Sequence, residues 1–297
     1  MRIITLLVRH GTEKYPTAIE DIAALFSRQM PAVQWDLLVI DNALPEDHRQ
    51  DIGPNRTLIG GSNAHWEFSG WDSGIKFLGE RLDTYDLVNL ATASFANLNP
   101  FYLDRINEEA LQLAFTTDSF ANFGRHIVER YVIGHIDYYN DLINIFGRPC
   151  QAWLQDSFLF LQPAELKKLG SRVSINDEIA AVIFSGDPAA PFRVDAPLPE
   201  NFKQHLLQSL AGDAPLSPLS PDTLPWFQSK VLKVLNEQLL TIRLRAQGCA
   251  MLDGSWLATR AETLLPMEQP LGFVPRWISQ VTTAGIRLPF CEDSSAA

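Results

Sequence analysis

Residues Leu58–Ala96, LIGGSNAHWEFSGWDSGIKFLGERLDTYDLVNLATASFA, decide how the rest of this chain is interpreted. The stretch begins at the end of an apolar strand and passes through a glycine-rich loop into an amphipathic helix. It then enters a second apolar run that stops at small hydroxyl residues. A glycine-rich loop between a strand and a helix N-terminus brings backbone N–H groups close to anionic ligands. The stretch therefore predicts a nucleotide pocket in an open α/β sheet.

The segments before this stretch show the same alternation of strand and helix. Ile3–Val8 and Trp35–Ile40 are continuous apolar runs of the length of buried strands. Between them, Pro16 starts a segment with helical spacing of its apolar residues. A second unit ends in the strand Asp86–Ala91. The predicted fold class is α/β, with a Rossmann-like, mostly parallel open sheet flanked by helices and a helical C-terminal segment.

The remaining elements are predicted in the same way. They are a helix over 99–114, a segment over 118–139 that is helical at first and a loop by Gly134, a strand over 152–161, a short helix from Pro163 to Gly170, a strand over 179–184, and helices over 200–210 and 226–247 followed by a strand over 249–257. Residues 1–211 are predicted to form one domain, with a nucleotide-binding half (1–98) and an acceptor half (99–211). A proline- and serine-rich linker over 212–225 leads to a mainly helical segment over 226–297 that packs on the domain.

Composition excludes several classes of function. The chain has 297 residues, 46% of them hydrophobic, and a formal net charge of -11. Such a charge disfavours nucleic acid or an anionic membrane as the main partner. No apolar run is long enough for an integral membrane segment, and the N-terminus is too short in apolar residues for a signal peptide, so we expect a cytoplasmic protein. The three cysteines form no CxxC pair, which predicts neither disulfides nor a zinc site.

A short motif, LVRHGTE at Leu7–Glu13, resembles the strand-end motif of the histidine phosphatase superfamily. The resemblance implies that His10 takes the phosphoryl group and that Arg9 holds its oxygens. A phosphatase of that family also needs a second His, a second Arg and an acid, and no later motif supplies them. We therefore favour the interpretation that Arg9 and His10 end a strand and line another kind of pocket, with the phosphatase as an alternative.

A longer resemblance covers about 95 residues. The strand ending at Asp41-Asn42, the loop Gly60–Asn63, the helix start Trp71–Ile75 and the strand Tyr85–Phe95 look like the nucleotide-binding half of a GT-A (family 2-like) glycosyltransferase. The resemblance implies a set of donor-binding residues, which are Arg9, His10, Asp41, Asn42, Ser62, Asn63, Trp71, Asp72, Gly74, Thr92 and Ser94. In this set, Asp41 reads the base and Thr92 and Ser94 lie at the diphosphate.

The chain departs from that family where a metal would bind. GT-A enzymes commonly end this strand with Asp-x-Asp, whose carboxylates hold Mn²⁺ or Mg²⁺, whereas this chain has Ala91-Thr92-Ala93-Ser94. Hydroxyls are poor substitutes for two carboxylate ligands of a hard cation. We therefore expect no divalent metal cofactor. Either basic groups such as Arg9, His10, Arg125 or His135 offset the charge of the leaving diphosphate, or the chain is a non-catalytic nucleotide-sugar-binding protein.

The acceptor side is predicted from the second half of the domain. Inverting enzymes of this kind use a carboxylate base near a helix start, and Asp187, Asp195 and Glu200 fit that description. A separate segment, with His135, Asp137 and Tyr138, could contact sugar hydroxyls and sugar faces. The sequence thus predicts a glycosyltransferase that moves a sugar from a nucleotide-sugar donor to a glycan or other hydroxyl acceptor. The C-terminal segment is expected to cover the acceptor cleft or to form a homodimer contact.

Overall fold

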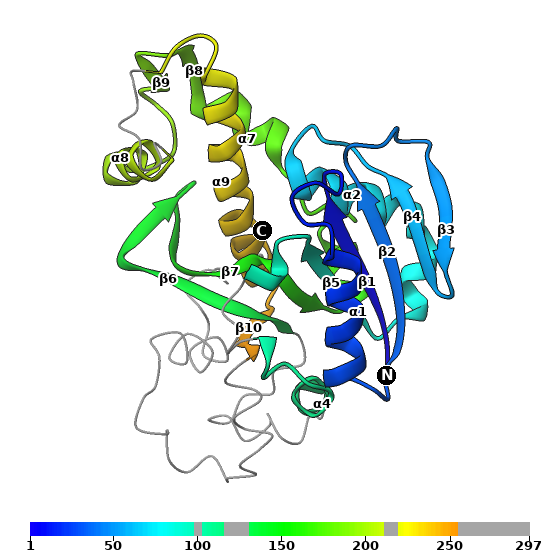
Figure 1. The fold of residues 1–297 in the computed structure, drawn as a ribbon. Coiled ribbons are helices and arrows are strands. Elements are labelled where there is room, and N and C mark those ends of the chain that lie inside the picture. Colours follow the sequence, from blue (N-terminus) through cyan, green and yellow to red (C-terminus); the bar gives the residue numbers. More distant parts are fainter. Residues whose placement is uncertain (98–102, 116–130, 211–218, 255–297) are drawn as a thin grey trace, which may run out of the picture.

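The computed structural model describes residues 1–97, 103–115, 131–210 and 219–254 (Figure 1). Its centre is an eight-stranded sheet with the order β10-β6-β7-β5-β1-β2-β4-β3. The strands are β1 (Arg2–Arg9), β2 (Gln34–Asp41), β3 (Arg49–Gly53), β4 (Arg56–Gly60), β5 (Leu87–Thr92), β6 (Tyr131–Ile145), β7 (Arg148–Leu161) and β10 (Ala250–Asp253). Neighbouring strands are parallel except where β3 and β7 pair with their neighbours. The predicted α/β class with a mostly parallel open sheet is confirmed.

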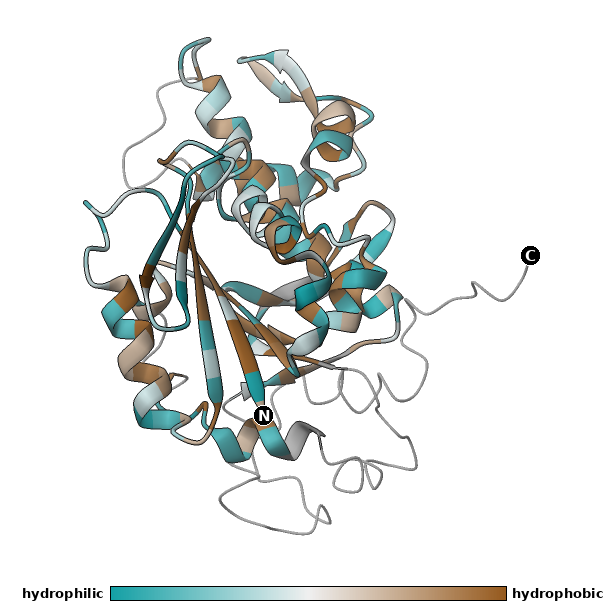
Figure 2. Cartoon of the chain, turned by 90° about the vertical axis from the view of Figure 1, so that its right-hand side faces the viewer, coloured by the Kyte–Doolittle hydropathy of each residue, from teal (hydrophilic) through white to brown (hydrophobic). Residues whose placement is uncertain are grey.

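Helices flank this sheet on both faces. They are α1 (Ala18–Gln29), α2 (Trp66–Leu78), α4 (Glu108–Phe115), α6 (Pro163–Lys168), α7 (Asn176–Ile183), α8 (Glu200–Ser209) and α9 (Leu224–Ala246), with 3₁₀ turns η1 (Gly79–Thr84) and η2 (Phe95–Asn97). A separate hairpin joins β8 (Phe184–Asp187) and β9 (Ala190–Phe192). The central strands are mainly hydrophobic, whereas the helices carry mixed faces (Figure 2). That pattern is expected for strands covered on both faces.

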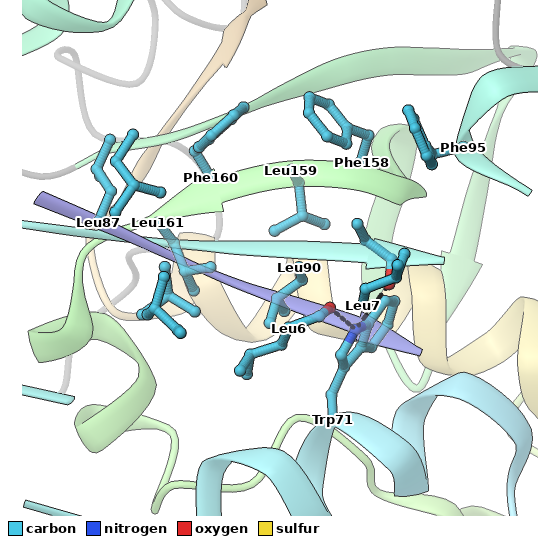
Figure 3. Packing of buried hydrophobic residues seen from close by; sticks show 14 of the residues in the cluster. Leu6, Leu7, Trp71, Leu87, Leu90, Phe95, Phe158, Leu159, Phe160 and Leu161 are labelled. Carbon is cyan, nitrogen blue, oxygen red and sulfur yellow. Dashed lines mark hydrogen bonds between the residues drawn. The ribbon is translucent and has the colours of Figure 1, made fainter. Parts of the chain in front are cut away.

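Side chains of alternating strand residues separate the two helical layers. Trp35 on β2 stacks on Phe26 of α1, with ring centroids 4.7 Å apart. The opposite face of the same strand packs against α2. A Cβ built on Gly74 of α2 would lie only 3.0 Å from the Ile40 side chain of β2. Odd and even residues of a strand point to opposite faces. Figure 3 shows the same separation across β7, where Phe158 and Phe160 point away from Trp71 of α2.

A second hydrophobic cluster lies beyond the main core. It is formed by the distal ends of β6 and β7, by α7, α8 and β9, and by the N-terminal half of α9. Figure 1 shows α9 between this part and the strands β1 and β2. The same helix also contributes Leu240 and Leu244 to the main core. Helix α9 therefore joins both cores, and the predicted division of the chain into domains stays a prediction.

Two predicted elements are wrong where the structure describes them. The segment expected to be a loop at Gly134 is part of β6, whose hairpin with β7 closes through Phe146 and Gly147, both at positive φ. The apolar run over 179–184 is mostly helix α7 rather than a strand. A short apolar run fits either state, and here Ile179 and Ile183 are buried one helical turn apart while Val182 is 40% exposed.

The helix expected over 99–114 is confirmed in part. In the described part of this segment, Leu103 is helical, and helix α4 begins at Glu108, after Asn107 accepts a hydrogen bond from the Ala110 amide at 2.8 Å. The strand β3, which pairs with β4 through the turn at Asn55, was not predicted at all. Its residues RQDIG are mostly polar and exposed, as is usual for an edge strand. The helix starting at Glu200 and the long helix α9 are confirmed.

Candidate functional site

Six strands end at one edge of the sheet, which we call the carboxyl edge. Strands β1, β2, β4 and β5 are parallel, and β6 and β10 run in the same direction because β7 is antiparallel to both β5 and β6. Ligands of open α/β sheets bind outside the carboxyl ends of the strands. Most donor-side residues predicted from the sequence lie at this edge or in the loops that follow it.

Asp41 and Arg9 form a buried ion pair at the ends of β2 and β1. Arg9 Nε donates to Asp41 Oδ2 at 2.8 Å, and the two side chains are 11% and 4% exposed. The other carboxylate oxygen accepts from the amides of Gly11 and Ala43, at 2.8 and 3.0 Å. Burial opposes ionisation, but these amides and Arg9 outweigh it and lower the pKa of Asp41. Asp41 therefore fixes the loop after β1, and its expected contact with a base stays a prediction.

Asn42 and Trp66 hold the start of α2. Asn42 Nδ2 donates to the Trp66 carbonyl at 2.8 Å, and Ser69 Oγ donates to the same carbonyl at 2.9 Å. Trp66 has a φ of 59°, a conformation that a bulky side chain seldom adopts. Such strain persists only where surrounding contacts fix the backbone, and it is common at functional sites. Here it places the Trp66 ring against Lys230 of α9, whose Nζ lies 4.0 Å from the ring centroid.

Two predicted donor-binding residues have a packing role. Trp71 is fully buried, and its indole N–H donates to the carbonyls of Leu6 and Ala91 at 3.1 and 3.3 Å (Figure 3). Its side chain joins α2 to β1 and β5, and so it does not reach the surface of the edge. Gly74 allows α2 to lie close to β2, since a Cβ there would meet Ile40. The donor contacts expected of Trp71 and Gly74 stay predictions.

A group of buried charges, which we call the acid–lysine cluster, lies beside the carboxyl edge. It consists of Glu67 on α2, Asp156 on β7, and Lys233 and Glu237 on α9. Lys233 Nζ lies 2.9 Å from Glu67 Oε1 and 2.9 Å from Asp156 Oδ2. Glu237 Oε1 accepts from the Asp156 amide at 2.9 Å. The side chains of Glu67 and Asp156 are only 9% and 5% exposed, whereas that of Lys233 is 30% exposed.

The protonation of this cluster follows from its burial. Burial and the charge of Asp156 raise the pKa of Glu67 to about 8, and the same causes raise the pKa of Glu237 well above its ordinary value. Burial opposes ionisation of Asp156, but Lys233 and a hydrogen bond from Glu67 lower the pKa of that carboxyl. At neutral pH the cluster therefore contains ionised Asp156 and Lys233 beside protonated Glu67.

The end of β5 faces this cluster. Phe158 of β7 pairs with Ala91, so Asp156 lies level with the turn that follows β5. In that turn the hydroxyls of Thr92 and Ser94 are 2.8 Å apart. Asp156 and Glu67 could approach a common cation, but the Lys233 ammonium already lies between them. Among the described residues, no three His, Cys, Asp or Glu side chains are arranged to hold a metal ion. The described residues around this turn therefore do not fit a divalent cation.

A polar cleft of about 340 Å³ lies on the β4 side of the edge. It is lined by the loop before α2, one face of α2, the segment before α7 and the first turn of α7, including Ser62, Ser73, Lys76, Arg172 and Asp177. The predicted donor residue Asp72 also lines it, and its carboxylate accepts from the Val173 amide at 2.6 Å and from the Ser174 hydroxyl. Asp72 therefore fixes the segment before α7. Asn63 and His10 are exposed at the edge.

The predicted bases lie apart from the carboxyl edge. Asp187 is at the turn of the β8–β9 hairpin, Asp195 follows it, and Glu200 starts α8, all in the part of the chain around the second hydrophobic cluster (Figure 1). All three are exposed. Hydrogen bonds from Arg193 lower the pKa of Asp195, and those from Gln204 and Lys203 lower that of Glu200. A lower pKa makes a carboxylate a weaker base.

The predicted acceptor residues lie on β6. His135 Nδ1 is 3.5 Å from Asp253 Oδ2 of β10, and Asp137 Oδ2 accepts from Gln155 Nε2 at 3.2 Å. Tyr138 belongs to β6, and its side chain lies outside what the structure describes, as does all of Arg125. The bulge between Gly134 and Ile136 places four β7 residues, Asp156 among them, opposite His135. The described acceptor residues thus border the acid–lysine cluster.

The sequence interpretation missed all four members of the acid–lysine cluster. A signal was nevertheless present, because each member interrupts an apolar segment: Glu67 in HWEFSGW, Asp156 in AWLQDSFLFL, and Lys233 and Glu237 in VLKVLNEQLL. Ionisable residues are almost never fully buried unless paired. An ionisable residue inside a core-type run is therefore a candidate for a paired, functional group.

Comparison with known proteins adds no assignment. No protein-family model and no curated protein matches this chain. Among solved structures, it is similar to a mannosyltransferase from Pyrobaculum calidifontis in complex with GDP-Man and Mn²⁺, with 13% sequence identity, a TM-score of 0.36, and coverage of 96% of this chain and 85% of that one. A likeness at this level supports no activity, substrate or metal for this chain. No described helix is long and apolar enough to cross a membrane.

Proposed function

We propose that the chain is a GT-A-like glycosyltransferase that moves a sugar from a nucleotide-sugar donor to a glycan or other hydroxyl acceptor without a divalent metal. The observation that carries this proposal is the convergence of charged side chains from five separate segments at the carboxyl edge. They are Arg9 on β1, Asp41 on β2, Glu67 on α2, Asp156 on β7 and Lys233 on α9. This is where open α/β sheets bind nucleotides.

In the proposed reaction, the acceptor hydroxyl oxygen forms a bond to the anomeric carbon of the sugar. The bond from that carbon to the donor diphosphate breaks, and its electron pair leaves with the diphosphate. We assign Glu67 as the group that accepts the proton of the acceptor hydroxyl, because a base works best with a pKa near the operating pH. The rate should rise as the pH rises through about 8, since only ionised Glu67 accepts a proton. Asp187, Asp195 and Glu200 remain alternative bases.

The proposal is tested by thermal stabilisation with a panel of nucleoside diphosphates in EDTA, followed by an assay of nucleoside diphosphate release from the matching sugar nucleotides. Stabilisation and acceptor-dependent release are expected, and Glu67→Gln should abolish release without abolishing stabilisation. Glu80→Gln, the same chemical change at an exposed position of η1, is the matched control and should leave both unchanged. No stabilisation by any nucleotide would contradict the proposal.

The two alternatives predict different results. A non-catalytic binding protein would be stabilised by a nucleotide but would release nothing from any donor. A histidine phosphatase would release phosphate from small phosphoesters and would lose this activity in His10→Ala. No observation favours the phosphatase, because the Arg9 guanidinium that should hold a phosphate donates instead to Asp41.

A further inference from the structure

The polar cleft on the β4 side of the carboxyl edge lies apart from the acid–lysine cluster. Ser69, Ser73 and Lys76 of α2 line it, and their spacing of four and three residues places them on one face of the helix. Glu67 and Trp71 each lie two positions from Ser69, on the opposite face. Among the described residues that line the cleft, none belongs to the five charged residues on which the proposed function depends. The proposed reaction therefore leaves this cleft unexplained.

One wall of the cleft is held from behind by helix α9. This wall is the segment 172–175, which carries Arg172 into the lining. Arg243 Nη2 donates to the Arg172 carbonyl at 2.9 Å, and Asn236 Oδ1 accepts from the Ile175 amide at 2.9 Å. These contacts are made to the backbone and leave the Arg172 side chain available to the cleft. The wall is therefore preorganised.

The facing wall, formed by the loop before α2, is held by the helix that follows it. The Ser62 amide donates to Ser73 Oγ at 3.2 Å, and Ser69 Oγ donates to the Ser62 carbonyl at 2.8 Å. The Ser62 hydroxyl accepts from the Ala64 amide at 3.3 Å and keeps its own O–H as a donor. Both walls are thus fixed by contacts that do not occupy the space between them.

Charged side chains in the cleft keep hydrogen-bonding capacity. Within the described part of the chain, the Lys76 ammonium has no hydrogen bond or ion pair. Arg172 Nη2 and His65 Nε2 lie 3.5 and 3.4 Å from the two oxygens of Asp177, beyond the ~2.7–3.2 Å of an N–H···O hydrogen bond. The Asp177 side chain is 77% exposed. Lys76 and Arg172 therefore offer donors to a ligand, and Asp177 offers acceptors.

The lining favours a neutral, polyhydroxylated ligand. It carries two carboxylates, Asp72 and Asp177, and two side chains with a formal positive charge, Lys76 and Arg172. Their formal charges cancel, so neither an anion nor a cation is attracted. Ala64 is the only apolar residue among the described residues of the lining, which leaves no surface for a nucleobase. A sugar hydroxyl both donates and accepts, so a sugar can pair with both kinds of group.

We propose that this cleft binds a neutral sugar unit, whose hydroxyls accept from Lys76 and Arg172 and donate to Asp177. The volume of about 340 Å³ lies near the lower end of the range for small-molecule sites, about 300–1,000 Å³. This inference goes beyond the proposed function, because it places a sugar on the face of α2 opposite Glu67 and requires neither a nucleotide nor turnover.

Saturation-transfer NMR titration of the full chain with the methyl glycosides of glucose, mannose, galactose and N-acetylglucosamine tests the site. Lys76→Met keeps the length of the side chain and removes its donors, and it should weaken glycoside binding by about tenfold or more. Asp177→Ala removes the acceptors and should weaken it similarly. The matched control is Lys167→Met, since Lys167 is also exposed but lies on α6 and pairs with Asp83. Thermal midpoints confirm that each variant is folded.

The outcomes separate this inference from the proposed function. Glycoside binding that depends on Lys76, together with no stabilisation by any nucleotide, would support the sugar cleft and contradict the glycosyltransferase. Stabilisation by a nucleotide, together with equal glycoside affinity in Lys76→Met and Lys167→Met, would support the glycosyltransferase and overturn the sugar cleft. Glycine and inorganic phosphate serve as charged probes of the same cleft. Binding of either probe without binding of any glycoside, or no binding of any glycoside at all, would also overturn it.

Discussion

Glu67→Gln is expected to remove much of the pH dependence of folding stability between about pH 5 and pH 9. Burial beside Asp156 raises the pKa of Glu67 from its ordinary 4.5 to about 8, so in this range the folded chain keeps a proton that the unfolded chain releases. The stabilisation of the folded chain by this bound proton is complete below the pKa of Glu67 in the unfolded chain. It is lost as the pH rises through the pKa of Glu67 in the folded chain. At ~1.4 kcal/mol per pH unit, the loss through Glu67 approaches about 4 kcal/mol across this range.

Gln cannot ionise but keeps the size of the side chain, so the unfolding free energy of the variant should fall less steeply with pH. Urea unfolding followed by tryptophan fluorescence at several pH values measures the difference. Asp156, Lys233 and Glu237 face Glu67 and are present in both proteins. Glu200→Gln should follow the wild-type profile, because Glu200 is exposed. Parallel profiles for wild type and Glu67→Gln would refute the assignment of a buried proton to Glu67.

Three further changes test how the edge is built. Trp71→Ala should cost about 3–5 kcal/mol of unfolding free energy in urea titration, because it empties a fully buried site between α2 and the sheet; a cost under about 1 kcal/mol would contradict this role. Gly60→Ala should destabilise the fold by about 3 kcal/mol or more, since its Cβ would lie 1.6 Å from the Pro45 carbonyl oxygen, and a thermal midpoint equal to the wild type would refute the close approach. Asp41→Asn should cost about 3 kcal/mol at pH 7 by leaving Arg9 buried without a charge partner. Because the native pKa of Asp41 is lowered, that difference should shrink as the pH falls below about 4, and a constant difference would contradict the ion pair.

Local patterns predicted most of the strands and helices in residues 1–97 because each signal there is short-ranged. The apolar runs of β1, β2 and β5 indicate strands that are buried on both faces, and the helical spacing in α2 indicates a helix that is buried along one stripe. Both patterns can be recognised without knowledge of a distant partner. The hydrophobic pattern was misleading where neither the length nor the period of an apolar run distinguished a strand from a helix. The run over 179–184 fits a strand or two turns of helix, and its packing against α9 within the second hydrophobic cluster decided for helix α7.

Some features of the candidate site could likewise be predicted from local sequence, and others could not. The sequence by itself determined that Arg9, Asp41, Thr92 and Ser94 lie at or just after the ends of strands of one sheet, because parallel strands end at a common edge. It also determined that the Thr92–Ser94 turn lacks carboxylates. The sequence could not show which side chains from other segments lie close to that turn.

Only the tertiary structure brought Glu67, Asp156 and Lys233 together from α2, β7 and α9, and only burial and mutual contact set their protonation. An isolated glutamate or lysine in a sequence has its ordinary pKa. Its pKa shifts when folding removes water and adds a charge within a few ångströms. The chemistry of this edge is therefore a property of contacts between segments that lie far apart in the chain.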